Sequence, residues 1–142
     1  IAATPAMHFS SRTIGDRGDT LWCGYAISSP GERRVYFAGD TGFHPEFPAI
    51  GERYGPFDVA LLPIGPYEPR WFMRYLHMNP EEAVDAFRLV NARAMVPIHW
   101  GTFKLTDEAM DEPPRRARDA WLAAGLPIAN YRQMAHGETL TL

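Results

Sequence analysis

The order of apolar and polar residues predicts a chain in which strands alternate with helices. Apolar runs with no polar side are typical of strands that are covered on both faces. Ser29–Glu32 should join two of these runs into a hairpin, because Pro30 fixes one dihedral and Gly31 tolerates a positive one. We expect strands over residues 1–4, 20–28, 33–38, 58–64, 94–98 and 139–142.

Three segments have the residue spacing of amphipathic helices. A short helix is expected over 45–54, and a long aromatic loop should follow over 65–78. Asn79 should cap the next helix, since Glu82 stands where a capping-box acid belongs. The last helix should end at Gly125. The apolar stripes of these two helices are Ala83, Val84, Phe87 and Val90, then Ala117, Ala120, Trp121 and Ala124. The alternation indicates the α/β fold class.

Composition describes an ordinary globular domain, which we take as one domain over residues 1–142. The net charge of -3 gives no electrostatic reason to expect nucleic acid as a partner. No apolar run approaches the roughly 18 residues of a membrane span. A single cysteine, Cys23, fits a reducing compartment, so we expect a cytoplasmic protein. The chain opens on Ile1 inside an apolar run, which suggests a processed or truncated sequence.

Each of three apolar stretches ends at a side chain that can bind a metal. Asp40 follows the run 35–39, where a carboxylate has little water and needs a cation, donors or a helix N-terminus to stay ionised. His8 and His99 end the stretches 4–8 and 95–99. Taken singly, a turn-capping aspartate and two core histidines would explain them. Together they offer the nitrogen and oxygen donors that zinc binds at about 2.0–2.2 Å.

Other residues are candidates for contact with a substrate. His77 lies two positions before Asn79, near the positive end of a helix where a phosphate is favoured, although an exposed loop histidine would look the same. Arg70 could contact phosphate or pair with Glu68 or Asp58. Three aromatic residues could form the wall of a substrate pocket or pack against the sheet, namely Tyr67, Trp71 and Phe72. The remaining histidines, His44 and His136, are expected at the surface.

Five motifs together resemble the C-terminal half of the metallo-β-lactamase superfamily, in the branch of N-acyl-phosphatidylethanolamine phospholipase D and near the ascorbate-phosphate lactonases. They are Thr-Pro-Ala-Met-His at 4–8, Phe-Ala-Gly-Asp-Thr-Gly at 37–42, the stretch 55–65, the stretch 67–73, and Ile-His-Trp-Gly-Thr-Phe at 98–103. The resemblance implies half of an αββα sandwich, a mixed sheet with covering helices, with a two-zinc site between the sheets of the complete fold. It also implies that His8 binds one zinc, His99 binds the other and Asp40 bridges them.

One family motif is absent from this chain. The His-x-His-x-Asp-His motif supplies the remaining protein ligands in the family, and the five histidines here are too far apart to form it. In the family this motif lies upstream of the position of His8. We therefore expect residues 1–142 to be the C-terminal part of the fold and to be inactive alone. The expected partner is the missing N-terminal half or a second copy of the chain.

The resemblance implies a zinc-dependent hydrolase, most simply a phospholipase D-like phosphodiesterase that uses a water shared by two metals. Asp40 and His77 would then act in catalysis. The expected substrate is a phosphodiester or phospholipid-like small molecule, with peripheral membrane contact only through a lipid substrate. A non-catalytic remnant or interaction module of the same fold is the alternative. A lactonase or a nuclease of the superfamily is a further alternative, and the acidic charge balance disfavours the nuclease.

Overall fold

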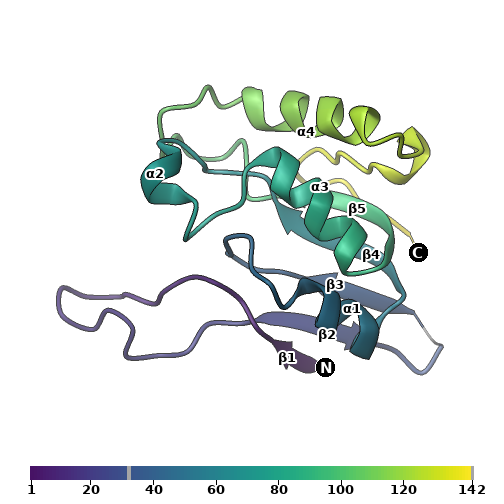
Figure 1. Ribbon diagram of the computed structural model, residues 1–142, viewed down its shortest axis with the longest axis horizontal. Coiled ribbons are helices and arrows are strands. Elements are labelled where there is room, and N and C mark those ends of the chain that lie inside the picture. The colour runs from purple at the N-terminus through teal and green to yellow at the C-terminus, as the bar shows by residue number, and fades with distance from the viewer. Residues whose placement is uncertain (32, 142) are drawn as a thin grey trace.

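The computed structural model describes residues 1–31 and 33–141, which are built on a mixed five-stranded sheet (Figure 1). The first pairings, between β1, β2 and β3, are antiparallel, whereas β3, β4 and β5 pair in parallel. This arrangement confirms the predicted α/β class with a mixed sheet. In spatial order the strands are β1 (Ala2–Thr4), β2 (Gly24–Ser28), β3 (Arg34–Phe37), β4 (Phe57–Pro63) and β5 (Ala92–Ile98).

The pairing pattern gives four strands the same direction. Because β1 is antiparallel to β2 and β2 is antiparallel to β3, β1 runs the same way as β3. Strands β4 and β5 continue in that direction. The carboxyl ends of β1, β3, β4 and β5 therefore lie along one edge of the sheet.

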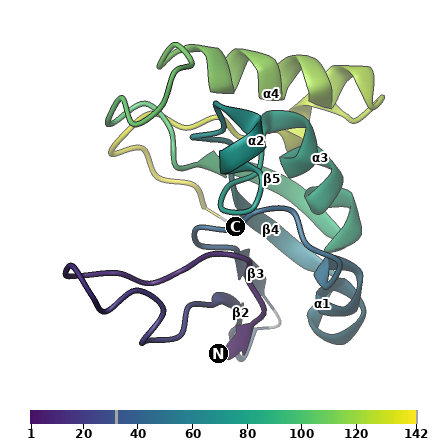
Figure 2. The same ribbon diagram turned by 60° about the vertical axis from the view of Figure 1, so that its left-hand side comes forward.

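Helices α1, α3 and α4 lie on one side of the sheet, as the rotated view shows (Figure 2). Helix α3 begins as predicted, since Asn79 and Glu82 form a capping box. Trp121 of α4 packs on Phe87 of α3 and on Tyr131. The helices are α1 (Phe47–Tyr54), α2 (Arg70–Met73), α3 (Pro80–Leu89) and α4 (Glu112–Ala123), followed by the 3-10 turn η1 (Ile128–Asn130).

The two faces of the sheet differ in how far they are covered. One register row, Ala26, Tyr36, Ala60 and Met95, belongs to the buried core that the helices cover. The next row alternates to the other face, where Tyr25 is 41% exposed. Its apolar neighbours on that face, Ile27, Val35, Phe37 and Leu61, are exposed or only half-buried. We call this second face the open face.

Several predicted boundaries are wrong. The first strand ends at Thr4, as expected, but the second strand begins at Gly24 and not at residue 20, because only residues 24–28 meet partner strands. The aromatic loop contains the unpredicted helix α2. Residues 139–141 form no strand, and the remaining residue of that prediction, Leu142, lies outside the described residues, as does Glu32 of the expected turn.

His44 is also a correction, since it is buried rather than at the surface. Its ring stacks on Phe47 with the centroids 4.0 Å apart. The helix that follows it therefore covers the side chain, which the polar character of histidine did not suggest. His136 is exposed, as expected. Among the described residues, none of the helices has the length and apolar character that crossing a membrane requires.

We predict that Gly51→Ala destabilises the fold although alanine is the better helix former. A Cβ at Gly51 would lie 2.5 Å from the carbonyl oxygen of Leu89 and 2.9 Å from the carbonyl carbon of Val90, so α1 and α3 would have to separate. We expect a loss of about 1–3 kcal/mol in the free energy of unfolding, measured by denaturant titration. The control is Gly31→Ala, whose Cβ would meet only Ser29 Oγ at 3.9 Å. Equal stability of the two variants would contradict the prediction.

Candidate metal centre

Four ionisable side chains meet at the edge where the carboxyl ends of the parallel strands lie. His8 Nε2 is 3.4 Å from His77 Nε2, and the rings of His77 and His99 stack with centroids 5.1 Å apart. His99 Nε2 is 3.3 Å from Asp40 Oδ1. The structure thus brings together the three predicted metal ligands and adds His77 to them. We call His8, Asp40, His77 and His99 the cluster.

His99 is held in an unusual backbone conformation directly after β5. Its φ of 60° lies in the left-handed region, which few residues other than glycine adopt. Its Nδ1 lies 2.7 Å from the carbonyl oxygen of Gly65, the residue that closely follows β4. A carbonyl can only accept, so Nδ1 carries the proton and donates. The ring is thereby fixed with Nε2 directed toward Asp40.

His8 is fixed in the same way, although it lies on irregular backbone after β1. Its Nδ1 is 2.7 Å from the carbonyl oxygen of Phe9, and its ring stacks on that of Phe9. The donor is again Nδ1–H, and Nε2 is directed into the cluster. Metal-binding histidines in proteins commonly donate the second ring N–H to a carbonyl or carboxylate, which fixes the tautomer. His8 and His99 both have this arrangement.

His77 differs from the other two histidines. It is 8% exposed, and its Nδ1 has no hydrogen-bond partner among the described residues. Burial is the main reason that its pKa falls to about 4, with the nearby His99 and His8 lowering it further. The imidazole is therefore neutral near pH 7. Because His8 carries its proton on Nδ1, its Nε2 accepts, and the hydrogen bond between the two Nε2 atoms places the proton of His77 on Nε2.

Asp40 and His99 form the charged pair of the cluster. The hydrogen bond from His99 holds the pKa of the Asp40 carboxyl below its usual range, against the opposing effect of burial. The same hydrogen bond raises the pKa of His99 above 6.5. The carboxylate thus has a cation beside it, but Asp40 is exposed and not shielded from water as the sequence analysis expected. In this arrangement the cation is the protonated ring of His99, and a metal ion could take its place beside the same carboxylate.

The donor set fits a metal such as zinc, because imidazole Nε2 atoms and a carboxylate oxygen come together in the cluster. Among residues 1–31 and 33–141, however, no group of three or more His, Cys, Asp or Glu side chains is arranged so that it could hold a metal ion. The cluster therefore has suitable donors without a completed coordination shell. The absence of the His-x-His-x-Asp-His motif from the sequence agrees with this geometry.

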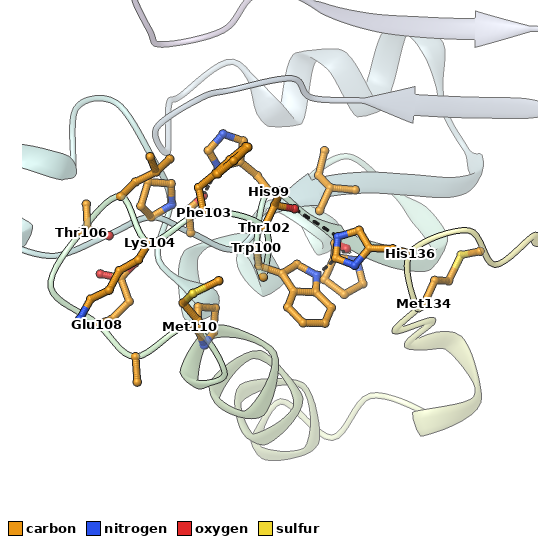
Figure 3. A pocket seen from close by; sticks show the side chains of 18 of the residues that line it. His99, Trp100, Thr102, Phe103, Lys104, Thr106, Glu108, Met110, Met134 and His136 are labelled. Carbon is orange, nitrogen blue, oxygen red and sulfur yellow. Dashed lines mark hydrogen bonds between the residues drawn. The ribbon is translucent and has the colours of Figure 1, made fainter.

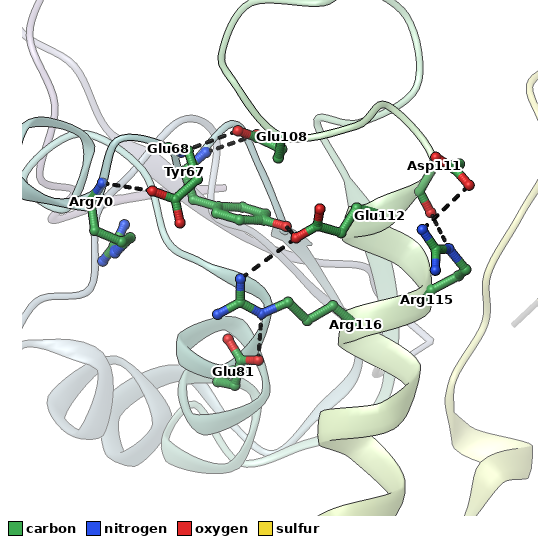
Figure 4. Close-up of polar contacts among 9 residues, drawn as sticks. All are labelled: Tyr67, Glu68, Arg70, Glu81, Glu108, Asp111, Glu112, Arg115 and Arg116. Atoms are coloured by element: carbon green, nitrogen blue, oxygen red, sulfur yellow. Dashed lines mark hydrogen bonds and ion pairs between the residues drawn. The ribbon is translucent and has the colours of Figure 1, made fainter.

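Arg70 holds the backbone of His77, a member of the cluster. Its Nη2 lies 2.7 Å and 2.8 Å from the two carboxylate oxygens of Glu82, and its Nη1 donates to the carbonyl oxygen of His77. The ion pair with Glu82 replaces the predicted pairing with Glu68 or Asp58, because Glu82 is brought close by the capping box of α3. The carboxylate of Glu68 instead accepts the backbone N–H of Arg70 (Figure 4).

Tyr67 packs inside the protein, which was one of its two predicted roles. It has no exposed surface, and its hydroxyl donates to Glu112 at 2.7 Å. Arg116 lies over its ring and bonds Glu81, while Glu108 accepts the backbone N–H groups of residues 67 and 68 (Figure 4). These contacts join the segment after β4 to α3 and α4.

Trp71 lies away from the cavity that adjoins the cluster. It is 77% exposed, and its neighbour Phe72 is about half exposed. A cavity of about 480 Å³ lies instead between the loop after β5 and the segment near His136 (Figure 3). His99 belongs to its wall, so the cavity reaches the cluster. Most of its other walls are apolar, with Trp100, Phe103, Met110 and Met134 among them, and Lys104 adds a cation.

The sequence analysis missed these cavity residues. They follow His99 in a stretch with neither helical nor strand periodicity, so no pattern marked them. The role of the Gly65 carbonyl could not be predicted either, since every residue has a backbone oxygen. The proximity of Gly65 to His99 results from the parallel pairing of β4 with β5.

Comparisons with known proteins were made over the whole chain. Residues 1–100 match the sequence family described as the Beta-lactamase superfamily domain. The N-acyl-phosphatidylethanolamine-hydrolyzing phospholipase D 1 of Caenorhabditis elegans is 49% identical over 117 residues, which are 81% of this chain and 33% of that protein. The mitochondrial N-acyl-phosphatidylethanolamine-hydrolyzing phospholipase D of Saccharomyces cerevisiae is 40% identical over 118 residues, or 82% of this chain and 25% of that protein.

A solved structure gives the same result. A novel metallo hydrolase from the archaeon Ignicoccus hospitalis superposes with a TM-score of 0.72 at 34% identity, over 98% of this chain and 51% of that chain. The chain thus spans about half of that structure and a third or less of the two curated relatives.

In the metal-free chain, we predict that His77 and His99 titrate at widely different pH values. His77 should stay neutral until the pH falls to about 4, because burial and the neighbouring histidines oppose its charging. His99 should keep its proton above pH 6.5, because the carboxylate of Asp40 favours the charged ring. The measurement is an NMR titration of the imidazole Cε1–H signals. A midpoint at or above pH 6.5 for His77 would show that the site is more open to water than the structure indicates.

Proposed function

The chain belongs to the β-lactamase superfamily, and from this premise we propose that it supplies part of the metal-binding site of a zinc-dependent hydrolase. Its sheet and helices match a metallo hydrolase structure over nearly the whole chain, which confirms the fold expected from the motifs. The relative from Ignicoccus hospitalis is a metallo hydrolase by name. What we propose beyond this is the activity of this chain, zinc as the metal, and the number of zinc ions.

The observation that carries the proposal is the shared orientation of His8 and His99. In each ring a backbone carbonyl accepts the Nδ1 proton, and Nε2 is directed into the cluster, toward His77 from His8 and toward Asp40 from His99. Two core histidines that served packing alone would not need the same Nδ1–H bond with Nε2 turned into one cluster. We assign His8 to one zinc ion and His99 to the other, with Asp40 between them. The remaining ligands would come from a His-x-His-x-Asp-His segment outside the 142 residues.

When bound, the zinc ions would lower the pKa of a water molecule and polarise the centre that it attacks. Asp40 would remain ionised throughout, because its pKa already lies below the usual range. His77 is neutral near pH 7 and has an unpaired Nδ1, so this nitrogen can accept a proton. Arg70 would hold His77 in place through its carbonyl.

The cavity beside His99 supports a substrate with an apolar part and an anionic part. Its walls are mostly apolar, as a hydrocarbon group requires, and Lys104 offers a cation for a phosphate. We propose a phosphodiester or phospholipid-like small molecule as substrate, in agreement with the names of the two curated relatives. Tyr67 is buried and Trp71 lies elsewhere, so neither is assigned to the substrate here.

We predict that His99→Ala and Asp40→Asn abolish zinc binding at their positions and lower phosphodiesterase activity at least about a hundredfold, because each removes a donor or its charge. The measurement is hydrolysis of bis-para-nitrophenyl phosphate by the protein with its natural flanking sequence, beside zinc content. The control is His136→Ala, which removes an exposed histidine outside the cluster. Full activity in the Asp40→Asn variant would refute the assignment.

The 142 residues alone should bind zinc weakly and hydrolyse phosphodiesters negligibly, since the ligand set is incomplete. Adding a polypeptide that carries the His-x-His-x-Asp-His segment should restore both properties. Rapid turnover by the 142 residues in a zinc-replete assay would show that the site is misassigned. Failure of the complete protein to bind zinc would favour the alternative, a non-catalytic remnant or interaction module of the same fold.

We also predict that the open face is covered in solution, by another part of the same protein or by a second copy of the chain. Leaving about 400 Å² of apolar surface wet costs on the order of 10 kcal/mol, which is comparable to the stability of a domain. Sedimentation of the 142 residues at micromolar concentration should show association or aggregation, and Ile27→Lys on this face should reduce it. A monodisperse species of 16.0 kDa with a cooperative melt would contradict the prediction.

A further inference from the structure

Thr41 is buried at the junction of the segments that carry the cluster. It directly follows Asp40 and has no exposed surface. Its hydroxyl accepts the backbone N–H of Met7 at 2.8 Å and donates to the carbonyl oxygen of Gly42 at 2.8 Å. Met7 is the residue before His8. A single hydroxyl therefore ties the chain at His8 to the chain at Asp40.

Two backbone hydrogen bonds complete the junction. The N–H of Gly42 donates to the carbonyl oxygen of Met7 at 2.8 Å, so both polar backbone atoms of Met7 are held. The N–H of Met78 donates to the carbonyl oxygen of Thr41 at 3.1 Å, and Met78 directly follows His77. The segments of His8 and His77 thus meet at the two residues after Asp40.

The close approach depends on Gly42 as well. A Cβ at this position would lie 2.9 Å from the carbonyl oxygen of Arg74, in the segment that leads to His77. No side chain other than hydrogen therefore fits there without a shift of backbone. Apart from the two bonds of the Thr41 hydroxyl, the junction consists of backbone contacts, and the bond from the N–H of Met7 is the one that needs a side-chain acceptor.

We propose that Thr41 is a positioning residue whose hydroxyl fixes His8 relative to Asp40 and His77. Valine has the shape of threonine without the acceptor, so it would leave the N–H of Met7 unpaired. Met7 lies beyond the end of β1, and no ladder of hydrogen bonds would replace the lost one. The inference rests on the proposed function, since the position of His8 matters for activity only if the cluster binds zinc.

The first test compares Thr41→Val with Thr41→Ser in the protein with its natural flanking sequence. Zinc affinity, measured by calorimetric titration with Zn²⁺, should fall at least about tenfold in Thr41→Val. Thr41→Ser keeps the hydroxyl and should remain within about threefold of the wild type. If Thr41→Val fails to fold by circular dichroism, Thr41→Ala takes its place with the same expectation.

Thr4→Val provides the matched control. Thr4 is also buried, but its hydroxyl has no hydrogen-bond partner among the described residues. The same chemical change should therefore leave zinc affinity unaltered there. Equal zinc affinity of Thr41→Val and wild type, or an equal loss in Thr4→Val, would overturn the positioning role.

A second readout needs no metal. The rings of His8 and His77 lie 5.0 Å apart between centroids, so their protons should show a nuclear Overhauser effect in the metal-free protein. This signal should persist in Thr41→Ser and disappear in Thr41→Val. If the wild type binds no zinc, the proposed function fails, and the ring signal alone then decides whether Thr41 positions His8. A signal that persists in Thr41→Val would overturn the inference in either case.

Discussion

The shared direction of β1, β3, β4 and β5 is the constraint on which the candidate site depends. Asp40 and His99 are far apart in the sequence, and they meet because each closely follows a strand that ends at the same edge. The antiparallel strand β2 is needed as well, since it returns the chain so that β1 runs parallel to β3. Reversing the direction of β1, β3 or β5 would move the candidate ligand that follows that strand to the opposite edge of the sheet.

Placing one carboxylate among three histidines has an electrostatic consequence. The carboxylate of Asp40 favours a positive neighbour, whereas burial, His99 and His8 disfavour a positive charge on His77. In the absence of a metal, the proton on His99 satisfies Asp40. A metal ion would have to displace that proton, so protons and metal compete for the same position. The protonated ring of His99 and a metal ion would therefore exclude each other beside Asp40.

The sequence predicted the features that depend on local spacing or on strand ends. The capping box at Asn79 was predictable because its partner is three residues away, and the approach of Asp40 and His99 because both follow apolar runs. Contacts between distant segments were not predictable. The burial of His44 depends on the placement of α1 beside it, and the pairing of Arg70 with Glu82 depends on where α2 and α3 lie. Neither arrangement leaves a periodic signal in the sequence.

The histidines of the cluster are not equivalent, and the difference lies in the backbone around them. Carbonyl oxygens fix the tautomers of His8 and His99, which leaves one nitrogen of each free for a metal. His77 has no such acceptor at Nδ1, although it is the most buried of the three. The backbone thus separates two histidines whose orientation suits a metal ligand from one that no backbone carbonyl holds at Nδ1, within a single cluster.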